Sequence, residues 1–191
     1  SLLTDKASTH LTCYNITPLE KSLAVKLEIP LFGTDPSMFY EGSKSGARKT
    51  FRLCGIEMPD GDEDLKSKEE IVRSLARLKR KDPGLRKAVI KMNDGFSGDG
   101  NAIYRYPDLE IDEFLETKIF DTLYQYTRPV SHDVSLDLFF EKFIEMEGIV
   151  EEFLEGEITA SPSVQCVIGA SDKIRIDSTH DQLLGGDDGQ I

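Results

Sequence analysis

The sequence predicts an α+β or α/β fold, with a mixed or antiparallel sheet and flanking helices. Helical and strand patterns alternate through the first two thirds of the chain, and two strands joined by a short turn follow. A loop with three glycines, NDGFSGDGN at residues 93–101, lies between two of the predicted strands. The predicted fold therefore includes a glycine-rich hairpin flap.

Two helices are predicted in the first third of the chain. Residues 11–16 alternate like a short strand, and TPLE at residues 17–20 then combines an N-cap, a first-turn proline and an N3 glutamate, which is a capping-box pattern. The first helix is expected to run to about Leu27. The segment IPLFGTDP breaks it, GSK at residues 42–44 opens a second helix, and Gly55 ends that helix.

A third helix is predicted after an acidic segment. Residues 56–59 are expected to form a short extended piece, and DGDED at residues 60–64 a solvated acidic loop. SKEE at residues 67–70 is a second capping-box pattern, and the helix that it starts is expected to end at DPG, residues 82–84. One face of this helix is apolar and carries Ile71, Leu75 and Leu78.

Strands and helices continue to alternate beyond this point. Residues 87–92 are predicted to form a strand, AIYRY at residues 102–106 a second strand, and residues 109–128 a mainly helical region. Ser131 is expected to cap an amphipathic helix that runs to about Glu147 and is ended by the glycine that follows. The predicted core-facing stripe of this helix is Val134, Leu138, Phe139, Phe143 and Ile144.

The last third of the chain is predicted to be mostly strand. Residues 149–154 form one expected strand. Two more, residues 163–169 and 173–179, are expected to pair across the turn ASD. The chain thus ends on two strands of a sheet.

The glycine loop and the lysine before it indicate an anion site. Gly95, Gly98 and Gly100 are expected to let the backbone adopt positive φ angles that aim several N–H groups at one anion. Lys91 lies in an otherwise apolar strand, where a charge is costly to bury unless it meets an opposite charge, and a bound phosphate would supply one. Two alternatives stay open: a hairpin turn without ligand, and an edge-strand lysine that prevents aggregation.

Other glycine-rich signatures do not fit this loop. It lacks the Gly-Lys-Ser/Thr that closes a Walker loop, and its glycines are in the wrong order for a dinucleotide fingerprint. A calcium loop is excluded, because neither this segment nor residues 60–64 continue with the required central glycine and terminal glutamate. A nucleotide phosphate is the first candidate ligand.

Two further segments join this hypothesis. Lys44 lies in the first turn of a predicted helix, where a structural or solvent role is the alternative. Residues 150–157 bring an apolar strand into a cluster of acids, which suits the sugar end of a nucleotide because carboxylates accept hydrogen bonds from ribose hydroxyls. Extended backbone at residues 152–154 would present one C=O and one N–H to an adenine edge, with Phe153 or Leu154 packed on the base. The alternative is an acidic strand end in an acidic protein.

Composition limits the function classes. The chain has 191 residues, 39% hydrophobic residues and a formal charge of -12, which argues against a nucleic-acid binder or a binder of anionic membranes. Three cysteines without a CxxC pair suggest neither a disulfide framework nor a zinc site, and a reducing cytoplasm fits best. The sequence contains no apolar run of membrane length and no initiator methionine, and we expect it to be part of a longer protein.

The combination resembles the ATP-grasp nucleotide-binding fold. More narrowly, KMNDGFSGDGNA at residues 91–102, SPSVQ at residues 161–165 and STHDQLLGGDDGQ at residues 178–190 are similar to peptide ligases of the pheganomycin type and to the ATP-grasp region of IQ-domain proteins. The resemblance implies three parts. Residues 1–40 would end a pre-ATP-grasp domain, residues 41–155 would form the first ATP-grasp subdomain, and residues 156–191 would begin a truncated second subdomain.

The resemblance also implies ATP-dependent joining of a carboxylate to an amine through an acyl phosphate. By position, Lys44 and Lys91 would neutralise the ATP phosphates, residues 151–154 would hold adenine, and Glu157 would be the ribose carboxylate. Backbone N–H groups that would cover the phosphates belong to Gly95, Ser97, Gly98 and Gly100. The residues expected at the adenine are Glu151, Glu152, Phe153 and Leu154.

Magnesium is implied as a second cofactor of the parent protein. Enzymes of this kind place a metal-binding carboxylate and a Glu-x-Asn element late in the second subdomain, and we expect both to lie outside these residues. These 191 residues alone are then expected to be inactive and at best a weak ATP binder. The alternative is a non-catalytic nucleotide-sensing or scaffold module with the same fold. The sequence assigns no catalytic residue, acid or amine substrate, or oligomeric state.

Overall fold

The structure is a computed structural model, and it describes residues 3, 5–95, 100–156, 160–169, 173–183 and 185. Its contacts divide the chain into two compact units, Ser1–Glu57 and Met58–Ile191, which are called unit 1 and unit 2. Each unit is described by itself. No helix in the described ranges is long and apolar enough to cross a membrane.

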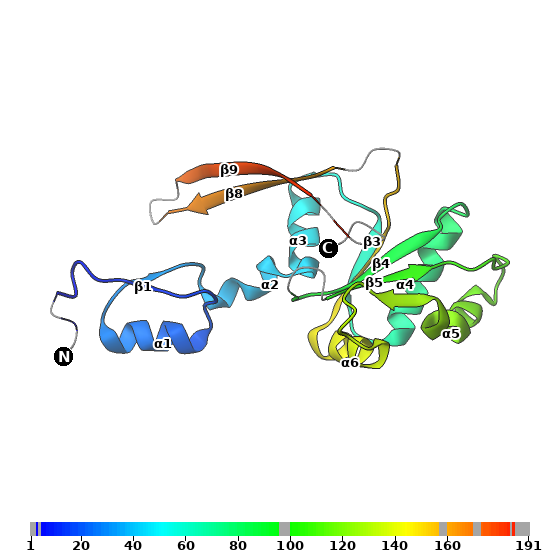
Figure 1. The fold of residues 1–191 in the computed structure, drawn as a ribbon, viewed down its shortest axis with the longest axis horizontal. Helices are drawn as coiled ribbons and strands as arrows, with labels where there is room; N and C mark the ends of the chain where they lie inside the picture. The colour runs from blue at the N-terminus through cyan, green and yellow to red at the C-terminus, as the bar shows by residue number, and fades with distance from the viewer. Residues whose placement is uncertain are drawn as a thin grey trace. The chain divides into compact units, whose positions relative to one another are not determined.

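Unit 1 is built from short helices and a two-stranded parallel sheet (Figure 1). Its strands are β1 (Leu11–Thr12) and β2 (Leu31–Phe32). Its helical segments are α1 (Pro18–Leu27), a 3-10 turn η1 (Pro36–Met38), α2 (Phe39–Gly42) and α3 (Lys44–Leu53). The two predicted helices are therefore confirmed, and η1 and α2 were not predicted.

Local capping explains why the helices of unit 1 begin and end where they do. The Thr17 side chain accepts from the backbone at the start of α1, and Glu20 reaches back to the Thr17 N–H, which completes the predicted capping box. Ser43 caps α3 by accepting from the Gly46 N–H, and Gly55 follows the helix with φ +66. A glycine takes this left-handed conformation without steric cost, which is why the helix ends there.

Unit 2 contains a five-stranded antiparallel sheet with the order β3-β7-β4-β5-β6. The strands are β3 (Gly61–Leu65), β4 (Lys87–Met92), β5 (Asn101–Arg105), β6 (Thr127–Pro129) and β7 (Gly148–Glu152). The helices are α4 (Lys68–Lys81), α5 (Leu115–Tyr126) and α6 (Leu136–Met146). Figure 1 shows these three helices gathered against the sheet.

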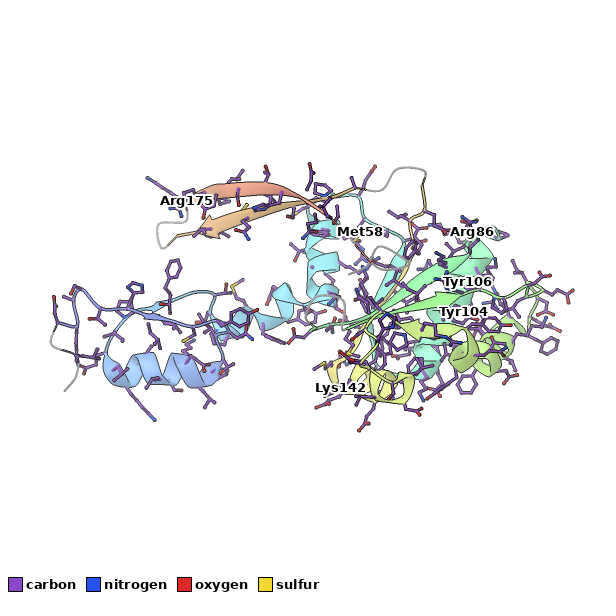
Figure 2. The ribbon with its side chains drawn as sticks, viewed as in Figure 1. Met58, Arg86, Tyr104, Tyr106, Lys142 and Arg175 are labelled. Atoms are coloured by element: carbon purple, nitrogen blue, oxygen red, sulfur yellow. The ribbon has the colours of Figure 1, made fainter. Side chains whose placement is uncertain are left out.

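The main core lies between α4, α5, α6 and one face of this sheet. Ala88, Ile90 and Met92 point into it from β4, because alternate strand residues share a face. From β5, Tyr104 lies in the core and stacks edge-on against Tyr106, with ring centroids 4.9 Å apart (Figure 2). The Tyr106 hydroxyl donates to the Leu75 carbonyl of α4, which joins the end of the sheet to the helix layer.

The predicted acidic loop at residues 60–64 is wrong, because Gly61–Leu65 is strand β3 and pairs with β7. Acidic residues can lie in and beside this strand because Arg77 of α4 neutralises two of them. Its guanidinium lies 3.1 Å from Asp60 and 2.8 Å from Asp62. The Lys81 amine adds a contact of 2.6 Å to Asp60. Burial by itself raises the pKa of Asp60, but hydrogen bonds from Lys81 and Arg77 outweigh it and lower this pKa to about 2.

Asp60→Asn is expected to lower the free energy of unfolding at neutral pH by about 1 kcal/mol, since its two ion pairs are partly solvated. A carboxyl whose pKa is lowered by folding stabilises the protein above its unfolded pKa, and this stability is lost as the pH falls through the folded value. The variant should therefore show a shallower loss of stability between about pH 4 and pH 2 in urea titrations. Glu141→Gln, at an exposed acid of α6, is the control and should keep the wild-type slope.

Helix α6 begins later than predicted. The prediction placed its N-cap at Ser131, whereas Ser135 caps it by accepting from the Leu138 N–H at 3.2 Å. The buried face is also partly different. Phe139 and Phe143 are buried as predicted, together with Phe140, but Leu138 and Ile144 are 40% and 48% exposed. Three phenylalanines at this spacing fix the face that packs on the sheet, and this turns Leu138 and Ile144 outward.

The last two described strands form a hairpin. They are the antiparallel strands β8 (Ser161–Ile168) and β9 (Ile174–Gln182). β8 starts two residues earlier than predicted and β9 ends three residues later, while the ends next to the turn are each one residue shorter. The predicted turn at residues 170–172 lies outside the described residues. Register pairs Ile168 with Ile174 and Cys166 with Ile176, so one face of this hairpin is apolar.

Candidate nucleotide-binding face of the sheet

The candidate site is the face of the unit 2 sheet opposite the helix layer. Register places Lys91 of β4 beside Ile149 of β7 and Asn101 of β5, and Val89 beside Glu151 and Ile103. Directly paired residues share a face, so these side chains all lie on the side away from α4, α5 and α6. Val89, Ile103 and Ile149 are buried. They form an apolar strip with Lys91 at one end.

Lys91 occupies an interior strand, since β4 has β7 on one side and β5 on the other. The alternative of an edge-strand lysine is therefore excluded. The Lys91 amine donates a hydrogen bond to the Glu151 carboxylate, and the two side chains are 24% and 10% exposed. The opposite charge that a lysine in an apolar strand requires is thus supplied by the protein itself in this structure.

The two ends of the glycine loop are held close together. The Met92 N–H donates to the Gly100 carbonyl at 2.8 Å, and the Asn93 N–H to the Glu147 carbonyl at 2.9 Å. A Cβ on Gly95 would lie 3.0 Å from the Gly100 Cα, and Gly95 has no positive φ. The expected positive φ angle is therefore wrong for Gly95. The close approach of the other arm of the hairpin favours a glycine at this position.

The expected adenine segment follows directly after β7. Two of its backbone N–H groups are used by the fold, because Glu152 donates to the Asp60 carbonyl at 2.8 Å and Phe153 to the Lys87 carbonyl at 3.2 Å. In the described part of the chain, no acceptor meets the N–H of Leu154, which is 65% exposed. Among the backbone N–H groups of residues 152–154, the N–H of Leu154 is thus the one left to donate to an adenine edge.

Three charged residues near this segment were missed by the sequence analysis. The Lys87 amine lies 4.9 Å from the centre of the Phe153 ring and 3.6 Å from the Glu155 carboxylate. Arg86, labelled in Figure 2, donates to Glu155 at 2.9 Å. One signal was available for Lys87: it lies four residues before Lys91 in a strand, and an even spacing puts both on one face.

The arrangement has the length and polarity of an extended nucleotide site. Strand residues rise about 3.3 Å each, so Lys87 and Lys91 are about 13 Å apart along β4. One end carries Phe153 and the N–H of Leu154, which no described residue accepts, and the middle is apolar. The other end carries Lys91 and the first residues of the glycine loop. Such a face can hold a flat base at one end and an anion at the other.

Several predicted site residues are not tested by this geometry. Lys44 is the first residue of α3 and belongs to unit 1. Ser97, Gly98 and Glu157 lie outside the described residues. Within the described ranges, no three histidine, cysteine, aspartate or glutamate side chains come together to hold a metal ion.

Sequence comparisons find similarity to one family model and to two curated proteins. The family model described as "IQCH-like, ATP-grasp" matches residues 37–118. The L-propargylglycine–L-glutamate ligase of Streptantibioticus cattleyicolor is 30% identical over 148 residues, which cover 76% of this chain and 28% of the ligase. The IQ motif-containing protein H of Danio rerio is 34% identical over 83 residues, which cover 42% of this chain and 8% of that protein. The chain thus spans less than a third of either curated relative.

A solved structure has a fold similar to that of this chain. The ADP complex of purK, N5-carboxyaminoimidazole ribonucleotide synthetase, matches 92% of this chain with a TM-score of 0.53 and 12% sequence identity. The match covers 38% of the synthetase chain. At this identity the likeness concerns the fold alone.

Proposed function

Because this chain has an ATP-grasp fold, we propose that it is the ATP-binding portion of an ATP-dependent carboxylate–amine ligase. The observation that carries the proposal is the position of Lys91. It lies on an interior strand, on the face of the sheet opposite α4, α5 and α6, directly before the glycine loop and beside the strand that leads to Leu154. This supports a nucleotide lying along β4, with its phosphates at Lys91 and its base at Leu154.

Bound ATP would supply a phosphoryl group to a carboxylate oxygen, with release of ADP, and an amine nitrogen would then attack the carbonyl carbon and displace phosphate. The protein's share is orientation and charge neutralisation. Lys91 and Lys44 would neutralise phosphate charge, and Glu157 would accept from the ribose. The loop residues that would cover the phosphates with N–H groups are Gly95, Ser97, Gly98 and Gly100. The named substrates of the Streptantibioticus relative suggest amino acids as the carboxylate and the amine.

ATP is expected to raise the thermal midpoint of the purified chain at millimolar concentration, and GTP to raise it less. A backbone N–H such as that of Leu154 pairs with the unprotonated N1 of adenine, whereas guanine carries a hydrogen at that position. Differential scanning fluorimetry with ATP, GTP and adenosine measures the effect. Equal midpoints with and without millimolar ATP would contradict the proposal.

The second candidate is a nucleotide-binding module without catalysis. It is favoured by the similarity to IQ motif-containing protein H and by the family model that matches residues 37–118. A phosphate-release assay with ATP, magnesium, a carboxylate and an amine separates the two for the parent protein. These 191 residues alone are expected to release no phosphate. Robust magnesium-dependent turnover by them would contradict our expectation that the metal ligands lie elsewhere.

A further inference from the structure

The Lys91 and Glu151 pair occupies the position proposed for the nucleotide phosphates. Lys91 is directly opposite Ile149, and Glu151 is directly opposite Val89, so the two charged residues are diagonal neighbours on one face of adjacent strands. Diagonal neighbours are within reach of long side chains. Their hydrogen bond ties the lysine to β7, and the glutamate is the more buried partner, at 10% exposure.

An anion that approaches Lys91 meets this carboxylate as well. To bind the lysine it must take the place of Glu151 as the charge partner, and the displaced carboxylate remains nearby as a like charge in a poorly solvated setting. Glu151 therefore lowers the affinity for every ligand that is held through a phosphate at Lys91. A group bound elsewhere, such as a base at Leu154, does not feel this competition.

We propose that Glu151 is an internal competitor for Lys91, which keeps ligands held by phosphate alone from occupying the site. Inorganic phosphate and pyrophosphate then bind weakly. A nucleotide still binds, because its base adds binding free energy that does not depend on Lys91. The same carboxylate recaptures Lys91 when phosphate products leave. This inference rests on the proposed phosphate-binding role of Lys91.

Isothermal titration with pyrophosphate, ATP and adenosine tests the proposal. Glu151→Gln is expected to raise the affinity for pyrophosphate and for ATP by about tenfold, because one like charge is removed beside the phosphates. Its affinity for adenosine is expected to stay within about twofold of the wild-type value. Glu116→Gln is the matched control. It removes the same charge from another ion pair, with Arg80 at 3.1 Å, on the helices that cover the opposite face of the sheet. It should change none of the three affinities.

A double-mutant cycle shows whether the effect acts through Lys91. In a Lys91→Gln background, the gain from Glu151→Gln should disappear. Unchanged or weaker pyrophosphate binding by a folded Glu151→Gln variant would overturn the proposal, and weaker binding would mean that Glu151 only orients the lysine. If circular dichroism shows that Glu151→Gln is unfolded, Glu151→Asp replaces it. That variant keeps the charge, shortens the side chain by one methylene, and should show a smaller gain in the same direction.

These measurements distinguish a failure of this proposal from a failure of the proposed function. If wild-type protein binds neither ATP nor adenosine, the proposed function fails, while a pyrophosphate gain in Glu151→Gln still supports the competitor. If ATP binds and requires Lys91 but Glu151→Gln brings no gain, the function stands and the competitor is refuted.

Discussion

Lys91→Ala is expected to abolish the thermal stabilisation that ATP gives to the wild-type protein. A charge-assisted contact of an amine with phosphate is worth about 1.5–3 kcal/mol, and its loss weakens binding by roughly 10- to 150-fold. At a ligand concentration of about 100 times the wild-type Kd, a 100-fold weaker variant keeps about 0.4 of about 2.7 kcal/mol of stabilisation. The shift in the midpoint should then be close to zero.

The measurement compares each variant with and without ATP, because Lys91→Ala also leaves the Glu151 carboxylate without its lysine and lowers the ligand-free midpoint. Lys142→Ala is the control. This lysine lies on α6 in Figure 2, is 47% exposed, and meets Glu145 at 4.0 Å. It should keep the full ATP shift. An undiminished shift in Lys91→Ala would refute the phosphate role of this residue.

Gly148→Ala is expected to destabilise unit 2 by about 3 kcal/mol or more, at the upper end of the cost of overpacking. A Cβ at this position would lie 2.2 Å from the Lys91 carbonyl oxygen and 2.4 Å from the Phe143 ring. The carbonyl belongs to an interior strand and cannot move without breaking the sheet. The ring is fully buried and has no free space to enter.

Urea unfolding followed by circular dichroism measures the effect of Gly148→Ala. Gly42→Ala is the control, because a Cβ there would meet nothing within 4 Å and the residue lies in helix α2. That substitution should leave stability unchanged or raise it slightly. A loss of less than about 1 kcal/mol in Gly148→Ala would mean that β7 and α6 can separate at little cost, contrary to the packing described.

Local sequence signals predicted most of the elements of the fold. Capping residues such as Thr17, Ser43 and Ser67 fixed helix starts correctly, because a cap is satisfied by atoms within three residues. Ser131 failed as a predicted cap because Ser135 offers the same chemistry four residues later, and packing of the phenylalanines decides between them. Strand β3 was missed because one of its acids, Asp62, is neutralised by Arg77, which is distant in the sequence.

The candidate site was predictable in its residue types and only partly in its contacts. Alternation showed that Lys91 stands apart from its apolar neighbours, but strand order was needed to show that β4 is interior. The partner of Lys91 is Glu151, and their approach depends on the register of β4 against β7. No local pattern encodes that register. The same is true of Phe153 and Lys87, which meet through a pairing of distant segments.

The position of β7 has a consequence for how the protein folds. It is the last strand of the five-stranded sheet along the chain, yet it lies between β3 and β4. The β4–β5 hairpin closes a short loop and can form early, whereas β3 gains its partner when residues 148–152 arrive. On the ribosome, β3 and one edge of β4 therefore wait unpaired for most of the synthesis of this unit. Strand insertion is expected to be the slow step of refolding, and the nascent chain should depend on chaperones until it is complete.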